Sequence, residues 1–304
     1  MMLGAMSPAR SLLRTRVRLL ILALGATIAA ACGGSSSSPT GPTTPGDSQP
    51  IAYSAIGASD AVGIGGSVPC ATLAPCPNGT GYVPVLARRL GEGGRQVTLT
   101  NLGIPAAVLS PEMQTLAAAA GSTTFTNMIQ HELPLLPAGS TLVTVFAGGN
   151  DTNAIAAAVE RGFGGSDPAG YVDEQVRVFG SGYDTLIRGI RDRASGARII
   201  VMNLPNLAGL PYASGYSLLR QRSMQRASVG ITTQVVNRLS SQNVLVIDLM
   251  CDARVYDPGN LASDGFHPND AGYALLADML YRAYTSGSSP PAASCPQMNV
   301  VPPL

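Results

Sequence analysis

Five short runs of aliphatic and β-branched residues constrain the fold of this chain more than any other feature. Each run is long enough for one buried strand, and amphipathic segments with helical spacing at residues 82–90, 171–194 and 218–241 lie between them. Strands that alternate with helices predict one parallel sheet with helices on both faces, an α/β three-layer sandwich. The predicted strands are residues 51–57, 96–102, 141–147, 198–204 and 244–249.

The composition fits a folded domain and removes two kinds of chemistry. The 304 residues are 45% hydrophobic and 12% charged, which excludes disorder over the whole chain. All 19 basic residues are arginine. Without a lysine, the chain has neither a Schiff-base site nor a Walker-type phosphate loop. We find no internal repeat and no second domain.

Metal and nucleic acid are not expected as ligands. The two histidines, His131 and His267, and five cysteines without a Cys-x-x-Cys pair do not supply a zinc site, so we expect no metal and no cofactor. The formal charge of +1 includes four arginines within the first eighteen residues, and without them the net charge is −3. No basic run follows Arg18, which argues against nucleic acid and against an anionic lipid surface as partners.

The first fifty residues have the layout of an export signal and a tether. An apolar run at 19–31 follows the arginines, and its thirteen residues are too few for a membrane span of about 20. Ala29, Ala30 and Ala31 before Cys32 resemble the lipobox of bacterial lipoproteins, which implies a signal peptide at 1–31 and a lipid on Cys32. The alternative is cleavage after one of those alanines, with Cys32 unmodified. Both place the protein in the periplasm or outside the cell, on a Ser/Thr/Pro/Gly tether at 32–50.

Export favours disulfides among the four other cysteines. Three pairings are open, and free buried cysteines are the alternative. We favour Cys70 with Cys76, which closes a short loop, and Cys251 with Cys295, which joins the Pro-rich tail at 285–304 to the segment after the fifth strand.

Polar residues and glycines follow four of the predicted strands. Ligands of such sheets bind beyond the carboxyl ends of the strands. Ser59 follows the first strand, Gly103 the second, Asn150 the third, and Asp264 and His267 come after the fifth. A lone serine in this place is more often a helix cap, and Gly103 and Asn150 alone are ordinary turn residues. Together they form a chemical set.

That set is suited to ester hydrolysis. The His267 imidazole would take the proton of the Ser59 hydroxyl, and Asp264 would orient the ring and stabilise its charged form. The charge that develops on the carbonyl oxygen needs fixed donors, and the N–H groups of Ser59 and Gly103 and the Asn150 amide are candidates.

These blocks resemble the SGNH hydrolases of the GDSL esterase and lipase superfamily. Ser59, Gly103, Asn150 and His267 follow the order of the four residues that name the family. Gly148-Gly149-Asn150-Asp151 matches its Gly-x-Asn-Asp block and Asp264 to His267 its Asp-x-x-His block, whereas Ala58 replaces the acidic residue before the serine. The resemblance covers 51–284 and implies a flavodoxin-like fold with a mainly five-stranded sheet, and hydrolysis through an acyl-enzyme.

The remaining candidates have structural explanations. His131 lacks a carboxylate partner and is interpreted as a surface or packing residue, and Asp60 and Asp151 as helix-start residues. Segments 104–139, 152–167 and 205–216 are expected to shape the pocket of a monomeric enzyme that acts on a small-molecule, lipid or glycan ester. Alternatives are a polysaccharide O-acetyl esterase or an acyltransferase with the same site, and a surface lipoprotein that binds glycan or lipid without turnover.

Overall fold

A computed structural model describes residues 49–304 except 123 and 125. The expected signal peptide, Cys32 and nearly all of the tether lie outside the described residues. Within the described part, no helix combines the length and the apolar character of a membrane span.

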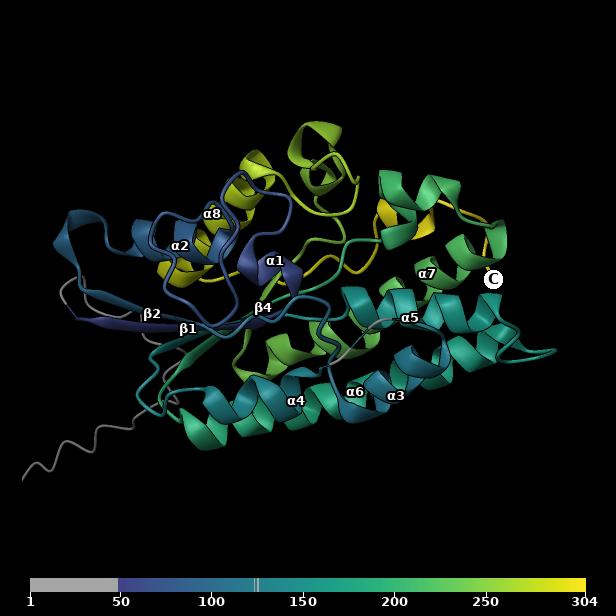
Figure 1. Ribbon diagram of the computed structural model, residues 1–304, viewed down its shortest axis with the longest axis horizontal. Helices are drawn as coiled ribbons and strands as arrows, with labels where there is room; N and C mark the ends of the chain where they lie inside the picture. The colour runs from purple at the N-terminus through teal and green to yellow at the C-terminus, as the bar shows by residue number, and fades with distance from the viewer. Residues whose placement is uncertain (1–48, 123, 125) are drawn as a thin grey trace, which may run out of the picture. The chain divides into compact units, whose positions relative to one another are not determined.

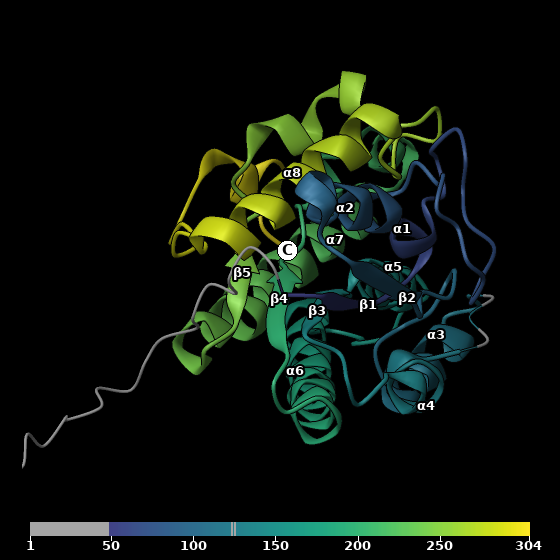
Figure 2. The same ribbon diagram turned by 90° about the vertical axis from the view of Figure 1, so that its left-hand side faces the viewer.

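Five parallel strands form one sheet in the order β2-β1-β3-β4-β5, so the predicted fold class is confirmed. Each strand lies inside a predicted run and is at most a few residues shorter. Figure 2 shows β2 and β5 at the two edges of the sheet. The strands are β1 (Ile51–Gly57), β2 (Val97–Asn101), β3 (Leu142–Phe146), β4 (Arg198–Met202) and β5 (Leu245–Ile247).

Helices cover both faces of the sheet (Figures 1 and 2). One face carries α1 (Ser59–Val62), α2 (Tyr82–Leu90) and α8 (Asp270–Ser286). The other face carries α3 (Pro111–Ala119), α4 (Met128–His131), α5 (Gly149–Glu160), α6 (Pro168–Arg193) and α7 (Leu218–Gly230).

The two faces arise from the alternation of side chains along each strand. Ile200 and Met202 of β4 pack with the α2 and α8 side, whereas Ile199 and Val201 pack with the α5 and α6 side. All four side chains are buried, which explains why the strands read as continuous apolar runs in the sequence.

Two predicted helices differ from their expected bounds for local reasons. Helix α6 begins three residues early, at Pro168, because the Asp167 side chain accepts the Gly170 N–H at 2.8 Å and caps it. The segment predicted as one helix at 218–241 continues after α7 as a π-helical turn, η5 (Ile231–Val236), and a 3₁₀ turn, η6 (Asn237–Gln242).

Both predicted disulfides, Cys70–Cys76 and Cys251–Cys295, are present, each with a Cα–Cα distance of 5.6 Å. The second disulfide holds a tail that packs on the domain. Its 3₁₀ turn η9 (Pro296–Asn299) buries Met298, and Asn206 donates to the Gln297 carbonyl at 2.9 Å. The segment 285–304 is therefore part of the folded unit.

Candidate active site

Ser59 lies at the carboxyl edge of the sheet, as expected for a residue that follows a strand. Strand β1 ends at Gly57, and Ser59 is the first residue of the short helix α1. The N–H of a first helical residue has no partner inside its helix. None of the described residues accepts the backbone N–H of Ser59. The Ser59 side chain is buried from bulk water but lines a small pocket.

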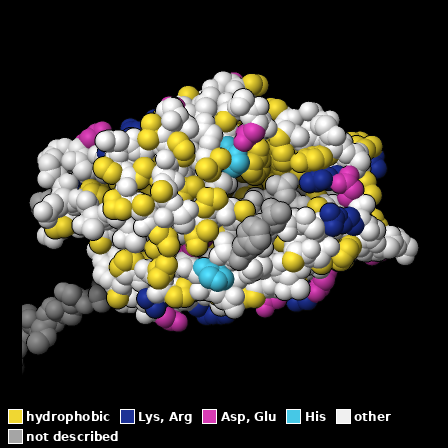
Figure 3. All heavy atoms as spheres, in the orientation of Figure 1, with side chains coloured by type: hydrophobic (Ala, Val, Ile, Leu, Met, Phe, Trp, Pro, Cys, Tyr) yellow, Lys and Arg dark blue, Asp and Glu magenta, His cyan; other side chains and the backbone are white. Residues whose placement is uncertain are grey.

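His267 and Asp264 complete a hydrogen-bonded chain with Ser59. His267 Nε2 lies 2.9 Å from Ser59 Oγ, and His267 Nδ1 lies 2.6 Å from Asp264 Oδ2. Ser59 and His267 are 208 positions apart in the sequence, and the fold brings them within proton-transfer distance. In the space-filling view, a histidine and an acidic side chain lie together beside hydrophobic side chains (Figure 3).

Asp264 is held on both of its oxygens. Oδ1 accepts the backbone N–H groups of Phe266 at 2.9 Å and His267 at 3.0 Å, while Oδ2 faces the imidazole. Partial burial alone would raise the pKa of Asp264. The hydrogen bonds from the ring and from these two N–H groups outweigh that effect and keep the pKa below its usual value. The group is therefore a carboxylate at neutral pH.

Asn150 lies across the pocket, in the first turn of α5. Helix α5 begins after Gly148, whose φ of 115° is a left-handed conformation that favours glycine and permits the sharp turn out of β3. The Asn150 amide donates one hydrogen to the Ala107 carbonyl at 2.9 Å. Asn150 and Ala107 line the same pocket as Ser59. Among the described residues the second amide hydrogen has no acceptor, so it remains for a ligand.

Gly103 does not have the surroundings expected of an oxyanion donor. It is buried, and its N–H donates to the Asn101 Oδ1 at 3.1 Å. A Cβ at this position would lie 2.5 Å from the Ala61 side chain, so Gly103 allows the loop to pack closely against α1. The structure therefore does not support the expectation that the Gly103 N–H faces a substrate.

Ala106, three residues farther along this loop, is a donor that sequence reasoning missed. Its φ of 62° is unusual for a residue with a side chain, and it is exposed beside Ala107, which lines the Ser59 pocket. No described residue accepts its N–H. Sparsely populated backbone conformations of this kind occur most often at functional sites.

Asp60 and Asp151 begin helices as predicted, but both carboxyls have further surroundings that the sequence did not indicate. Asp60 lines the Ser59 pocket, and burial raises its pKa. Asp151 is fully buried and accepts the Leu109 N–H at 3.0 Å, and burial raises its pKa to about 7. The exposed His131 contacts the Asn127 backbone, in agreement with a structural role.

Nothing in the described part of the chain forms a candidate metal site, since no three His, Cys, Asp or Glu side chains gather as ligands would. The segment 205–216 contributes Pro205, Leu207 and Leu210 to a second cavity beside the site. The other lining residues are Asp60 and residues between Leu249 and Leu276, most of which sequence reasoning did not single out.

Comparison with known proteins identifies similar chains. Residues 55–275 match the model of the GDSL-like Lipase/Acylhydrolase family. No curated protein matches the sequence. Among solved structures, a lipase from a goat rumen metagenome is 19% identical with a TM-score of 0.50, covering 78% of this chain and 98% of that chain.

Two further solved structures have a similar extent of overlap. An extracellular lipase from Streptomyces rimosus is 17% identical with a TM-score of 0.53, covering 77% of this chain and 99% of that chain. An acetylxylan esterase from Geobacillus stearothermophilus is 17% identical with a TM-score of 0.49, covering 81% and 99%. At 19% and 17% identity, the similarity of this chain to the two lipases is a similarity of fold.

Proposed function

The chain belongs to the GDSL-like lipase/acylhydrolase family and is a hydrolase of ester bonds, and from this premise we propose that it is a serine esterase that works through an acyl-enzyme. The observation that carries the proposal is the continuous hydrogen-bonded chain from Ser59 Oγ through the His267 ring to Asp264, with contacts of 2.9 and 2.6 Å.

Each of these three hydrogen-bonded residues has one task in the proposed reaction. Ser59 Oγ attacks the ester carbonyl while His267 Nε2 accepts its proton, and Asp264 holds the ring in the required tautomer and stabilises the imidazolium. The imidazolium then donates the proton to the departing alcohol. A water molecule, activated by His267 in the same way, releases the acid and restores Ser59.

The negative charge on the carbonyl oxygen would be stabilised by amide donors around Ser59. We assign this role to the Ser59 N–H and the free hydrogen of the Asn150 amide, with the Ala106 N–H in the place expected for Gly103. Two of these are backbone groups that the fold holds in place, so they need no reorganisation as charge develops.

Hydrolysis of a p-nitrophenyl ester by the purified protein tests this proposal. We expect Ser59→Ala and His267→Ala to lose nearly all activity, and Asn150→Ala to lose about 10²- to 10³-fold in kcat. His131→Ala is the matched control, since it removes the only other histidine and should leave kcat unchanged. An active Ser59→Ala variant would exclude the mechanism.

Labelling with a serine-reactive fluorophosphonate separates the esterase from a non-catalytic binding protein. The folded wild type should be labelled at Ser59, and a binding protein would remain unlabelled. Partition of the acyl group between water and an added alcohol, measured by product analysis, separates hydrolysis from acyl transfer.

We propose further that the enzyme is an exported lipoprotein with its lipid on Cys32. The support is the order of arginines, apolar run, alanines and Cys32 in the sequence. Mass analysis of the mature N-terminus tests it, because an unmodified N-terminal residue would exclude the lipid.

A further inference from the structure

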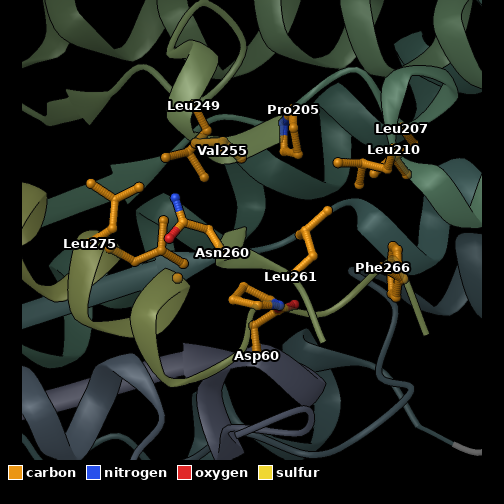
Figure 4. A pocket seen from close by; sticks show the side chains of 13 residues that line it. Asp60, Pro205, Leu207, Leu210, Leu249, Val255, Asn260, Leu261, Phe266 and Leu275 are labelled. Atoms are coloured by element: carbon orange, nitrogen blue, oxygen red, sulfur yellow. The ribbon is translucent and has the colours of Figure 1, made fainter. Parts of the chain in front are cut away.

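A second cavity adjoins the Ser59 pocket, and Figure 4 shows the side chains that line it. Its walls come from four parts of the fold: Asp60 of α1, the segment after β4, the segment after β5 with the 3₁₀ turns η7 (Ala253–Tyr256) and η8 (Pro258–Asn260), and helix α8. Aliphatic side chains form most of the lining, among them Leu207, Leu210, Leu249, Val255, Leu275 and Leu276.

The cavity adjoins the site of the proposed reaction. Asp60 and Phe266 line both this cavity and the Ser59 pocket. Asp60 directly follows Ser59 in the sequence, and Phe266 directly precedes His267. The Phe266 ring contacts the rings of Tyr212 and His267, each with a centroid distance of 4.7 Å. A group bound in this cavity would therefore lie next to the ester that Ser59 attacks.

The cavity offers few groups for a polar ligand. Of its side chains, only those of Asp60 and Asn260 carry polar atoms. The Asn260 amide already donates to the Arg254 carbonyl at 2.9 Å. The Asp60 carboxyl has no hydrogen-bond partner other than its own backbone N–H among the described residues, and burial raises its pKa, which favours the neutral form. A sugar would leave most of its hydroxyl groups unpaired here.

We propose that this cavity binds a linear apolar chain of the ester substrate, so that the enzyme prefers esters with a medium-length alkyl chain over acetylated sugars. The proposal rests on the proposed function, because it assumes that Ser59 attacks the ester. The bound alkyl chain is that of the acid or that of the alcohol of the ester, and the same apolar surface would recognise either one. Burial in an aliphatic cavity provides the driving force for either.

The test is a pair of substrate series with the purified protein. One series extends the acid, from p-nitrophenyl acetate through butyrate to octanoate, and the other extends the alcohol, from ethyl to octyl acetate. Each buried methylene contributes about fourfold to kcat/KM. We therefore expect a rise of at least tenfold along one series, and that series identifies the bound chain.

Substitutions on α8 connect the preference to this cavity. Leu275 is half-buried and lines it, so Leu275→Trp should fill the space and lower the ratio of kcat/KM for the longest to the shortest ester at least tenfold. Leu275→Ala should enlarge the cavity and move the optimum to longer chains. Met279, one turn farther along α8, is also half-buried but does not line the cavity, and Met279→Trp should leave the ratio unchanged.

Each outcome has a separate meaning. A flat response in both series, equal effects of Leu275→Trp and Met279→Trp, or a preference for acetylated xylo-oligosaccharide over all alkyl esters would overturn this inference while the esterase assignment stands. If Ser59→Ala matched the wild type on p-nitrophenyl acetate, the proposed function itself would fail.

Discussion

Asp264 contacts His267 twice, through the ring Nδ1 at 2.6 Å and through the backbone N–H at 3.0 Å. One carboxylate thus fixes both the loop and the imidazole that the loop carries. Because the second oxygen is used for the backbone, the first has little freedom to leave the ring. This relationship separates the role of the charge from the role of the loop conformation.

Asp264→Asn is expected to lower kcat by about 10³- to 10⁴-fold with little loss of stability. The asparagine oxygen still accepts the two backbone N–H groups, but its NH₂ group faces Nδ1 and favours the wrong tautomer. Steady-state kinetics with a p-nitrophenyl ester measures the effect. Asp257→Asn is the control, because Asp257 caps a turn in the same segment through its Oδ1 and should keep wild-type kcat. A fully active Asp264→Asn would show that this carboxylate has no part in the reaction.

Glu132 is predicted to be a positioning residue for Ser59. It is fully buried, and its Oε2 accepts the Gly57 N–H at 2.9 Å, two residues before the nucleophile. Burial raises the pKa of Glu132 well above its usual value, against the hydrogen bond from the Gly57 N–H. The neutral acid therefore holds the turn that carries Ser59, and the Ile104 N–H, which donates to the Gly57 carbonyl at 3.2 Å, joins the loop of Ala106 to the same turn.

Glu132→Gln should keep kcat within about threefold, because the amide oxygen replaces the acceptor. Glu132→Ala leaves a buried N–H unpaired, which costs about 1–3 kcal/mol of stability, and should lower kcat at least tenfold with little change in KM, since small displacements of a nucleophile are costly. The rate of fluorophosphonate labelling reports the position of Ser59 independently. A folded Glu132→Ala variant with wild-type labelling and kcat would assign Glu132 to stability alone.

The sequence predicted those parts of the molecule that local pattern determines. The strands are continuous apolar runs because both faces of the sheet are covered. Ser59, Asp264 and His267 could be predicted as a site because residues that follow parallel strands gather at the same edge of the sheet. The orientation of single N–H groups within a loop is different. The sequence predicts Gly103 as a donor because glycine permits close approach, but Asn101 accepts its N–H, and that contact depends on how the loop folds.

Buried carboxyls and the cavity were equally beyond the sequence. A lone glutamate is most often exposed, and only the contact of Glu132 with Gly57, 75 positions away, reveals its role. The cavity in Figure 4 is formed by segments that are continuous in space and separate in sequence, so no single segment carries its pattern.

The stability of the protein is predicted to fall as the pH rises from about 4 to 7. The folded state raises the pKa of Asp151 from 3.8 to about 7, so between these values the folded state binds more protons than the unfolded state. The stabilising contribution is complete below pH 4 and is lost as the pH passes 7, with a total of about 4 kcal/mol. Urea unfolding at pH 5 and pH 8 measures it.

Asp151→Asn provides the control for this effect. Asparagine keeps an oxygen for the Leu109 N–H and does not ionise. The variant should therefore lose much less stability than the wild type between pH 5 and pH 8. An equal loss in both proteins would assign the pH dependence to other groups, among which Glu132 has a pKa raised in the same direction.

The Cys251–Cys295 disulfide is predicted to stabilise the protein more than Cys70–Cys76 does. It joins residues 44 positions apart, against 6 for the other, and closure of the longer loop removes more entropy from the unfolded chain. Replacement of Cys251 and Cys295 by serine should lower the free energy of unfolding by about 4 kcal/mol, and the same change at Cys70 and Cys76 by about 2 kcal/mol. Urea unfolding of the two double variants compares them directly.

The longer loop also anchors the tail whose backbone binds Asn206 and Gln225, so its loss should expose the tail to proteolysis first. Equal destabilisation by the two pairs would mean that the tail holds its place through these side chains alone.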